Sequence, residues 1–171
     1  MISSSRCTSS LATARFSTTA SSSVSNSPIV VLKDDDEKFF LPIWVGIFEA
    51  NAIALQLENI TTPRPMTHDL LRNMIAELNA RVLRIVINDL RDSTFFAQIR
   101  LAIGSERTLE VDARPSDAIA LALRTEAPIF VAQSVLDQAQ TISPDEAESS
   151  EEKSQKWFEE LSPEDLGKYK M

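Results

Sequence analysis

The chain has 171 residues, of which 43% are hydrophobic, and a formal net charge of −8 at pH 7. This length and apolar content allow one domain of ordinary size with a real core, plus tails. The negative charge argues against a tight, nonspecific nucleic-acid binder, because such binding usually draws on Lys and Arg. No stretch is long and apolar enough to span a membrane. Cys7 is the single cysteine, which excludes an internal disulfide and suits a reducing, cytoplasmic location.

Composition divides the chain into three parts. Residues 1–27 are rich in Ser and Thr and lack acidic side chains, which indicates a disordered or mis-started segment or, alternatively, an organelle transit peptide. No part of the chain before Val24 has the pattern of a strand. Residues 28–136 are expected to form the domain. Residues 137–171 are expected to form an acidic, partly helical tail.

The domain is predicted to open with two strands, residues 29–32 and 39–45, on either side of a solvated acidic turn at residues 34–37. A helix over residues 49–57 follows. A second helix is expected over residues 69–78, with Thr67 as its N-cap. Five apolar residues of this second helix have the spacing of one buried face. They are Leu70, Leu71, Met74, Ile75 and Leu78.

Three strands in a meander are predicted next, at residues 82–88, 94–103 and 108–112. The middle strand alternates apolar and polar side chains, which is typical of a half-buried antiparallel strand. A helix over residues 116–124 and a final strand over residues 128–132 complete the domain. The predicted fold class is α+β: a mixed, largely antiparallel sheet packed with about three helices, between a disordered N-terminal segment and an acidic C-terminal tail.

Polar side chains gather at two predicted helix entrances. Asp112, Arg114, Ser116 and Asp117 lie where a strand leads into a helix, and Ser116 is its expected cap. Arg64, His68 and Asp69 lie before and within the first turn of another helix, and His68 is the only histidine. The helices at residues 49–57 and 116–124 are rich in small residues. If they pack side by side, Glu49 and Asp117 lie near one another.

These side chains include the residue types that bind divalent metal ions. Carboxylate oxygens are ligands that Mg²⁺ or Mn²⁺ prefers, and the candidate metal ligands are Asp112, Asp117, Asp69 and Glu49. The alternative is structural, because first-turn carboxylates interact with the helix dipole and can pair with arginines.

Histidine titrates near neutral pH, so His68 is a candidate general acid or base, with Asp69, Asp112 and Asp117 as further catalytic candidates. As an alternative, the ring of His68 forms only a structural hydrogen bond. Guanidinium groups bind phosphate through parallel hydrogen bonds, but they pair with carboxylates equally well. The candidate substrate-binding residues are Arg64, Arg114, Ser116 and Arg124.

Three segments, in this order, carry a resemblance to a known family. They are Leu41-Pro-Ile-Trp-Val-Gly, Arg64-Pro-Met-Thr-His-Asp-Leu and Asp112-Ala-Arg-Pro-Ser-Asp-Ala-Ile-Ala-Leu. From about residue 28 to residue 136 the chain resembles the bifunctional nuclease (DNase/RNase) domain family. The resemblance implies a small α+β domain that cleaves DNA and RNA, and we expect a metal-assisted nuclease of low sequence specificity. The alternative is a non-catalytic, oligomeric binding or regulatory module for an anionic ligand or a protein partner.

Overall fold

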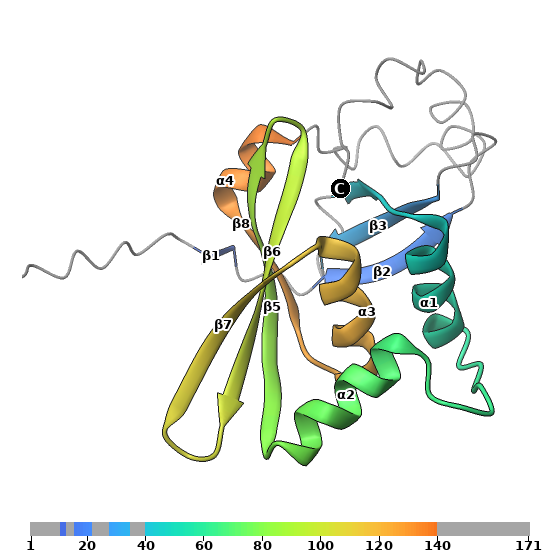
Figure 1. The fold of residues 1–171 in the computed structure, drawn as a ribbon. Coiled ribbons are helices and arrows are strands. Elements are labelled where there is room, and N and C mark those ends of the chain that lie inside the picture. Colours follow the sequence, from blue (N-terminus) through green and yellow to red (C-terminus); the bar gives the residue numbers. More distant parts are fainter. Residues whose placement is uncertain (1–10, 13–15, 22–27, 35–39, 140–171) are drawn as a thin grey trace, which may run out of the picture.

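The computed structural model describes residues 11–12, 16–21, 28–34 and 40–139 (Figure 1). Within these residues the elements, in chain order, are β1 (Leu11–Ala12), β2 (Phe16–Ser21), β3 (Ile29–Asp34), β4 (Phe40–Trp44), α1 (Ile47–Leu57), α2 (Thr67–Glu77), β5 (Ala80–Arg91), β6 (Thr94–Ile103), β7 (Arg107–Ala113), α3 (Pro115–Thr125), β8 (Ile129–Ala132) and α4 (Gln133–Gln138). The predicted α+β class is confirmed. The short helix α4 was not predicted.

The larger of the two sheets has five strands in the order β1-β8-β5-β6-β7. Neighbouring strands are antiparallel except β5 and β8, which run parallel, so the sheet is mixed as expected. The hairpin between β5 and β6 turns through Asp92 and Ser93, both with positive φ, and this geometry matches the twist of the two strands.

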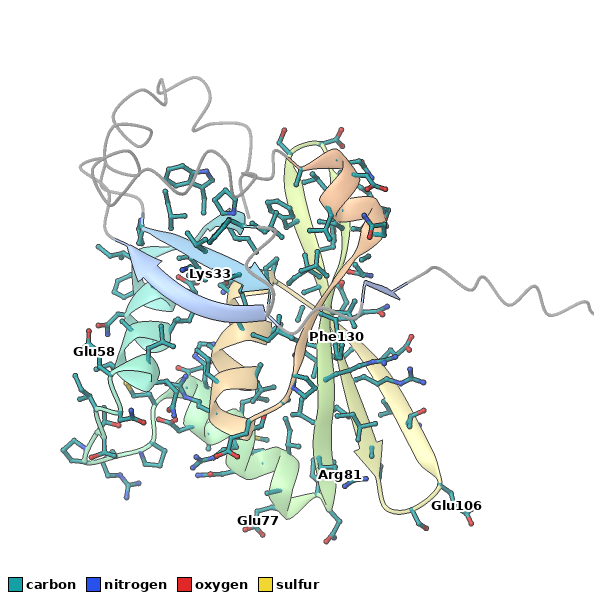
Figure 2. The ribbon with its side chains drawn as sticks, turned by 180° about the vertical axis from the view of Figure 1, so that it is seen from behind. Lys33, Glu58, Glu77, Arg81, Glu106 and Phe130 are labelled. Carbon is teal, nitrogen blue, oxygen red and sulfur yellow. The ribbon has the colours of Figure 1, made fainter. Side chains whose placement is uncertain are left out.

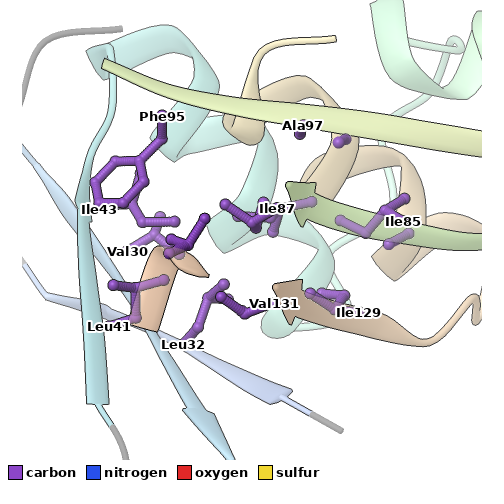
Figure 3. Packing of buried hydrophobic residues seen from close by; sticks show 14 of the residues in the cluster. Val30, Leu32, Leu41, Ile43, Ile85, Ile87, Phe95, Ala97, Ile129 and Val131 are labelled. Carbon is purple, nitrogen blue, oxygen red and sulfur yellow. The ribbon is translucent and has the colours of Figure 1, made fainter. Parts of the chain in front are cut away.

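The hydrophobic core lies between this sheet, a second sheet of β2, β3 and β4, and helix α3. Figure 3 shows Val30 and Leu41 of the second sheet packed near Ile87 and Val131 of the first. Helix α3 presents a run of buried small and apolar residues, Ala118 to Ala122, to the same core. Helices α1 and α2 both pack on α3, so α3 is the central helix of the layer.

The expectation that no strand precedes Val24 is wrong. Strand β2 pairs antiparallel with β3 over its whole length, from Phe16 opposite Asp34 to Ser21 opposite Ile29. Ser- and Thr-rich segments carry little apolar pattern, but β3 would be an edge strand without β2, and the unpaired backbone groups of an edge accept any extended chain. The division at residue 27 stays a prediction, and the acidic turn falls largely on residues 35–39, outside the described residues.

The predicted buried face of α2 is also wrong. Leu70, Leu71, Met74 and Leu78 are exposed, by 38% to 70%, and of the five apolar residues only Ile75 packs against the core. The buried residue of α2 is instead His68. The cause is the packing of the helix, because its N-terminal polar residues rather than its apolar stripe point to α3.

Both predicted caps are displaced by one or two residues. Thr67 is the first residue of α2, and the cap position is Met66, whose amide donates to Asp69 Oδ2 at 2.9 Å. At α3 the cap position is Arg114, with Pro115 following it, and Ser116 is buried inside the first turn. Proline favours this first position because it has no amide hydrogen to leave unpaired. No helix among the described residues is long and apolar enough to cross a membrane.

Candidate functional site

The starts of α2 and α3 meet through one histidine and one aspartate. His68 Nε2 lies 3.2 Å from Asp117 Oδ1, and the imidazole side chain is 11% exposed. The two residues come from the two polar clusters that the sequence singled out. The entrances of the two helices therefore face one another at this pair.

Arg114 joins the same group from the last position before α3. Its Nε donates to Asp117 Oδ2 at 2.8 Å and its Nη2 to Asp117 Oδ1 at 3.1 Å. The same Nη2 lies 2.8 Å from Oε1 of Glu49 on α1. Helices α1 and α3 lie side by side, as expected from their small residues, and Arg114 connects the two carboxylates. We call His68, Asp117, Arg114 and Glu49 the His68 cluster.

The ionisation of the His68 cluster follows from these contacts. Burial raises the pKa of Asp117, but its hydrogen bonds with Arg114 and His68 outweigh this effect and hold the pKa below its usual value. The pKa of Arg114 is raised because the guanidinium donates to Asp117 and Glu49. The aspartate therefore stays ionised at neutral pH and favours a proton on the ring nitrogen that faces it.

Asp69, the residue after His68, belongs to a separate structural contact. Arg124 Nε donates to Asp69 Oδ1 at 2.6 Å, and the Arg124 side chain is only 3% exposed. The other Arg124 nitrogens donate to the carbonyl oxygens of Ala120 and Ala52. Burial raises the pKa of Asp69, but the Met66 amide and the Arg124 guanidinium outweigh it and lower the pKa. Asp69 and Arg124 therefore tie α2 and α1 to α3.

A pocket of about 330 Å³ lies beside this contact, between the end of α1, the following loop and α2. Its wall includes Ile60, Met66 and Arg72, together with Asp69 and Arg124. Of the charged groups that line it, Asp69 and Arg124 are already paired with each other.

The remaining predicted site residues are not part of the His68 cluster. Asp112 is exposed on edge strand β7, opposite Gln98, and it takes part in no hydrogen bond or ion pair found within the described part of the chain. Because side chains alternate along a strand, Asp112 points away from the face that carries the partly buried Ala113. Ser116 is fully buried, so its hydroxyl does not face a substrate. Arg64 is exposed in the loop before α2.

The four carboxylates proposed as metal ligands do not converge. Asp69 pairs with Arg124, Asp112 lies apart, and the guanidinium of Arg114 lies between Glu49 and Asp117. In the ranges that the structure describes, no group of three or more His, Cys, Asp or Glu side chains is placed to hold a metal ion. As arranged, these residues do not fit Mg²⁺ or Mn²⁺.

The contact between Glu49 and Arg114 was not predicted, because it joins residues far apart in the sequence. The contact of Arg114 with Asp117 had a local signal, since residues three apart share one side of a helix.

Comparisons with known proteins assign the chain to a family. The bifunctional nuclease domain matches residues 30–144. An uncharacterized protein of Mycobacterium tuberculosis is 39% identical over 150 residues, which cover 82% of this chain and 89% of that protein. Bifunctional nuclease 1 of rice (Oryza sativa subsp. japonica) is 31% identical over 105 residues, which cover 60% of this chain and 32% of the rice protein. Bifunctional nuclease 1 of Arabidopsis thaliana is 29% identical over 107 residues, covering 61% of this chain and 33% of that protein. The chain belongs to the bifunctional nuclease domain family.

Proposed function

We propose that this chain is a nuclease that hydrolyses phosphodiester bonds in DNA and RNA with low sequence specificity. Its family and the names of its plant relatives support the activity. The main support for placing the active site at the His68 cluster is the contact between His68 Nε2 and Asp117 Oδ1 at 3.2 Å. A histidine oriented by an ionised aspartate is a recurrent arrangement for general acid–base catalysis.

In this proposal, the Nε2–H group of His68 donates a hydrogen bond to Asp117, which leaves Nδ1 as the basic nitrogen. Nδ1 takes a proton from a water molecule, whose oxygen attacks phosphorus. The bond between phosphorus and the leaving oxygen breaks, and that oxygen receives the proton from His68. Asp117 keeps the ring oriented and stabilises the imidazolium that forms between the two transfers.

Arg114 is proposed to bind the phosphate that is attacked. Its side chain is 52% exposed, although two carboxylates hold one side of the guanidinium. A guanidinium has five N–H groups, so the donors that Glu49 and Asp117 do not use remain for phosphate oxygens. Positive charge at this point stabilises the negative charge that develops during the attack. Exposed Arg64, in the loop before α2, is proposed to bind a neighbouring phosphate.

None of these steps uses a bound metal ion, because the candidate carboxylates, as arranged, do not fit one. Dependence on Mg²⁺ or Mn²⁺ stays a prediction, as do cytoplasmic location and a homo-oligomeric state. The assay therefore includes both ions and EDTA.

A non-catalytic module is the second candidate, and one observation favours it. Glu49, Asp69 and Asp117 are each paired with an arginine, which is the pattern of a structural network. Such a module binds an anionic ligand or a protein partner without turnover.

Cleavage of labelled single-stranded DNA and RNA by the purified chain separates the two functions. Under the nuclease proposal the wild-type protein cleaves both, and His68→Gln abolishes most of the activity while the circular dichroism spectrum is retained. Absence of cleavage by wild-type protein under all three metal conditions would leave the binding module as the function.

A further inference from the structure

The five-stranded sheet has a second face that the proposed catalytic residues do not use. Ile85, Ile87, Phe95 and Ala97 point from β5 and β6 into the core, so the alternate residues of these strands point the other way. In Figure 2, helices α1, α2 and α3 lie on one side of the long strands, and side chains project from the opposite side. We call this opposite side the open sheet face.

Two arginines face one another at the centre of the open sheet face. Arg84 on β5 and Arg100 on β6 are direct cross-strand partners. Like charges in this position repel, so the pair costs stability unless an anion lies between them. Arg100 has only a distant carboxylate, Glu110 Oε1 at 3.9 Å, and Arg84 forms no ion pair within the described part of the chain. The Nε of Arg84 is buried and has no hydrogen-bond partner there.

Two aromatic rings lie on the same sheet face as the arginine pair. Phe130 on β8 is paired with Val86, two residues from Arg84, and the Arg84 guanidinium lies 5.8 Å from the centre of its ring. Phe96 precedes Arg100 by four residues on β6 and therefore shares its face, with the Arg91 guanidinium 5.0 Å from the ring centre. Both rings are half-buried, so part of each remains accessible.

We propose that the open sheet face binds a single-stranded nucleic acid, with phosphates at Arg84 and Arg100 and bases stacked at Phe96 and Phe130. Arginine pairs bind phosphate oxygens, and bases stack on aromatic rings and on guanidinium planes. A duplex hides its base faces, whereas an unpaired strand exposes them, so this combination selects a single strand. The proposal rests on the proposed function, because it names the strand state of the substrate of that nuclease.

Binding of fluorescent single-stranded and hairpin RNA to the full chain, measured by anisotropy, tests the proposal. The variants are Arg84→Gln with Arg100→Gln, and separately Phe130→Leu. The control is Arg107→Gln, an exposed arginine at the start of β7. We expect the double arginine variant to raise Kd at least about tenfold and to make binding less sensitive to salt, and Phe130→Leu to raise Kd about fivefold or more. The control changes Kd less than about twofold, a single exposed charge being screened by salt.

Three results overturn the proposal: equal Kd values for single strand and hairpin, equal binding of polyglutamate, or variants that bind like the wild type. Absence of binding by the folded wild-type chain also overturns it. The proposed function fails separately. If single strands bind through the arginines but are not cleaved, the nuclease proposal is wrong and the binding role of the open sheet face is supported. If the chain cleaves nucleic acid but the variants bind like the wild type, the nuclease proposal is supported and the binding role of the open sheet face is wrong.

Discussion

His68 Nε2 lies 3.2 Å from Asp117 Oδ1, although 49 residues separate them in the chain. The next residue, Asp69, contacts Arg124, which lies near the other end of α3. Two adjacent residues of α2 thus contact two residues of α3 that are about 10 Å apart along the axis of that helix. The contact between His68 and Asp117 is proposed to act in catalysis, and the contact between Asp69 and Arg124 to stabilise the fold. Substitutions at His68 and Asp69 are therefore expected to have different effects.

Asp117→Asn is expected to lower cleavage by about 10²-fold or more, because an amide neither orients His68 equally well nor stabilises its protonated form. Asp112→Asn is expected to lower it much less, since Asp112 lies outside the His68 cluster. Initial rates on one labelled oligonucleotide, for protein variants with matched unfolding midpoints, give the comparison. A larger loss in Asp112→Asn would restore the sequence-based prediction of a site centred on that residue.

Asp69→Asn is expected to destabilise the fold by about 1–3 kcal/mol, because it leaves the buried guanidinium of Arg124 without its charged partner. Urea unfolding followed by circular dichroism measures the change. Asp137→Asn serves as the control, since Asp137 is exposed on α4 and pairs only with Gln133 among the described residues. An unchanged midpoint for Asp69→Asn would show that the contact with Arg124 contributes nothing to stability.

The lowered pKa of Asp69 predicts how this stability depends on pH. A carboxyl whose pKa is lower in the folded than in the unfolded state stabilises the fold above its unfolded pKa of about 3.9. The stability is lost as pH falls through the lower, folded value. The difference in unfolding free energy between wild type and Asp69→Asn should therefore be constant near neutral pH and shrink below about pH 4. A difference that grows on acidification contradicts the assignment.

Ile119→Ala is expected to cost about 2–5 kcal/mol, because Ile119 is fully buried in the core that α3 shares with both sheets. Leu71→Ala should cost less than about 1 kcal/mol beyond its small helix-propensity effect, since Leu71 is 38% exposed. Denaturant unfolding of both variants and of the wild type measures these two losses of unfolding free energy. Equal, large losses would mean that the apolar stripe of α2 is covered in solution.

Much of the fold could be predicted because strong local patterns decide it. Strands β5 to β7 and helix α3 have clear periodicity, and their structure follows the prediction closely. Strand β2 could not be predicted, because its pairing depends on the edge of β3 rather than on its own residues. The exposed face of α2 was missed for a related reason: an amphipathic pattern shows that a helix has an apolar side but not that a neighbour covers it.

The candidate site was predictable in its parts but not in its arrangement. Helix starts can be recognised from Pro115 and from first-turn acids, and these brought His68 and Asp117 forward as candidates. Which carboxylate pairs with which arginine depends on how α1, α2 and α3 cross. That packing keeps Asp69 apart from Asp117. Asp112 lies on edge strand β7 and points to the face of the sheet opposite the core.

Cleavage by highly purified wild-type protein and His68→Gln, on single-stranded DNA and RNA with Mg²⁺, Mn²⁺ or EDTA, tests the central claim most directly. Asp137→Asn is purified in the same way as a control for contaminating nucleases. The account predicts that wild type and control cleave equally and that His68→Gln loses about 10²-fold or more of the rate while remaining folded. Equal cleavage by all three proteins, or by none, would contradict it.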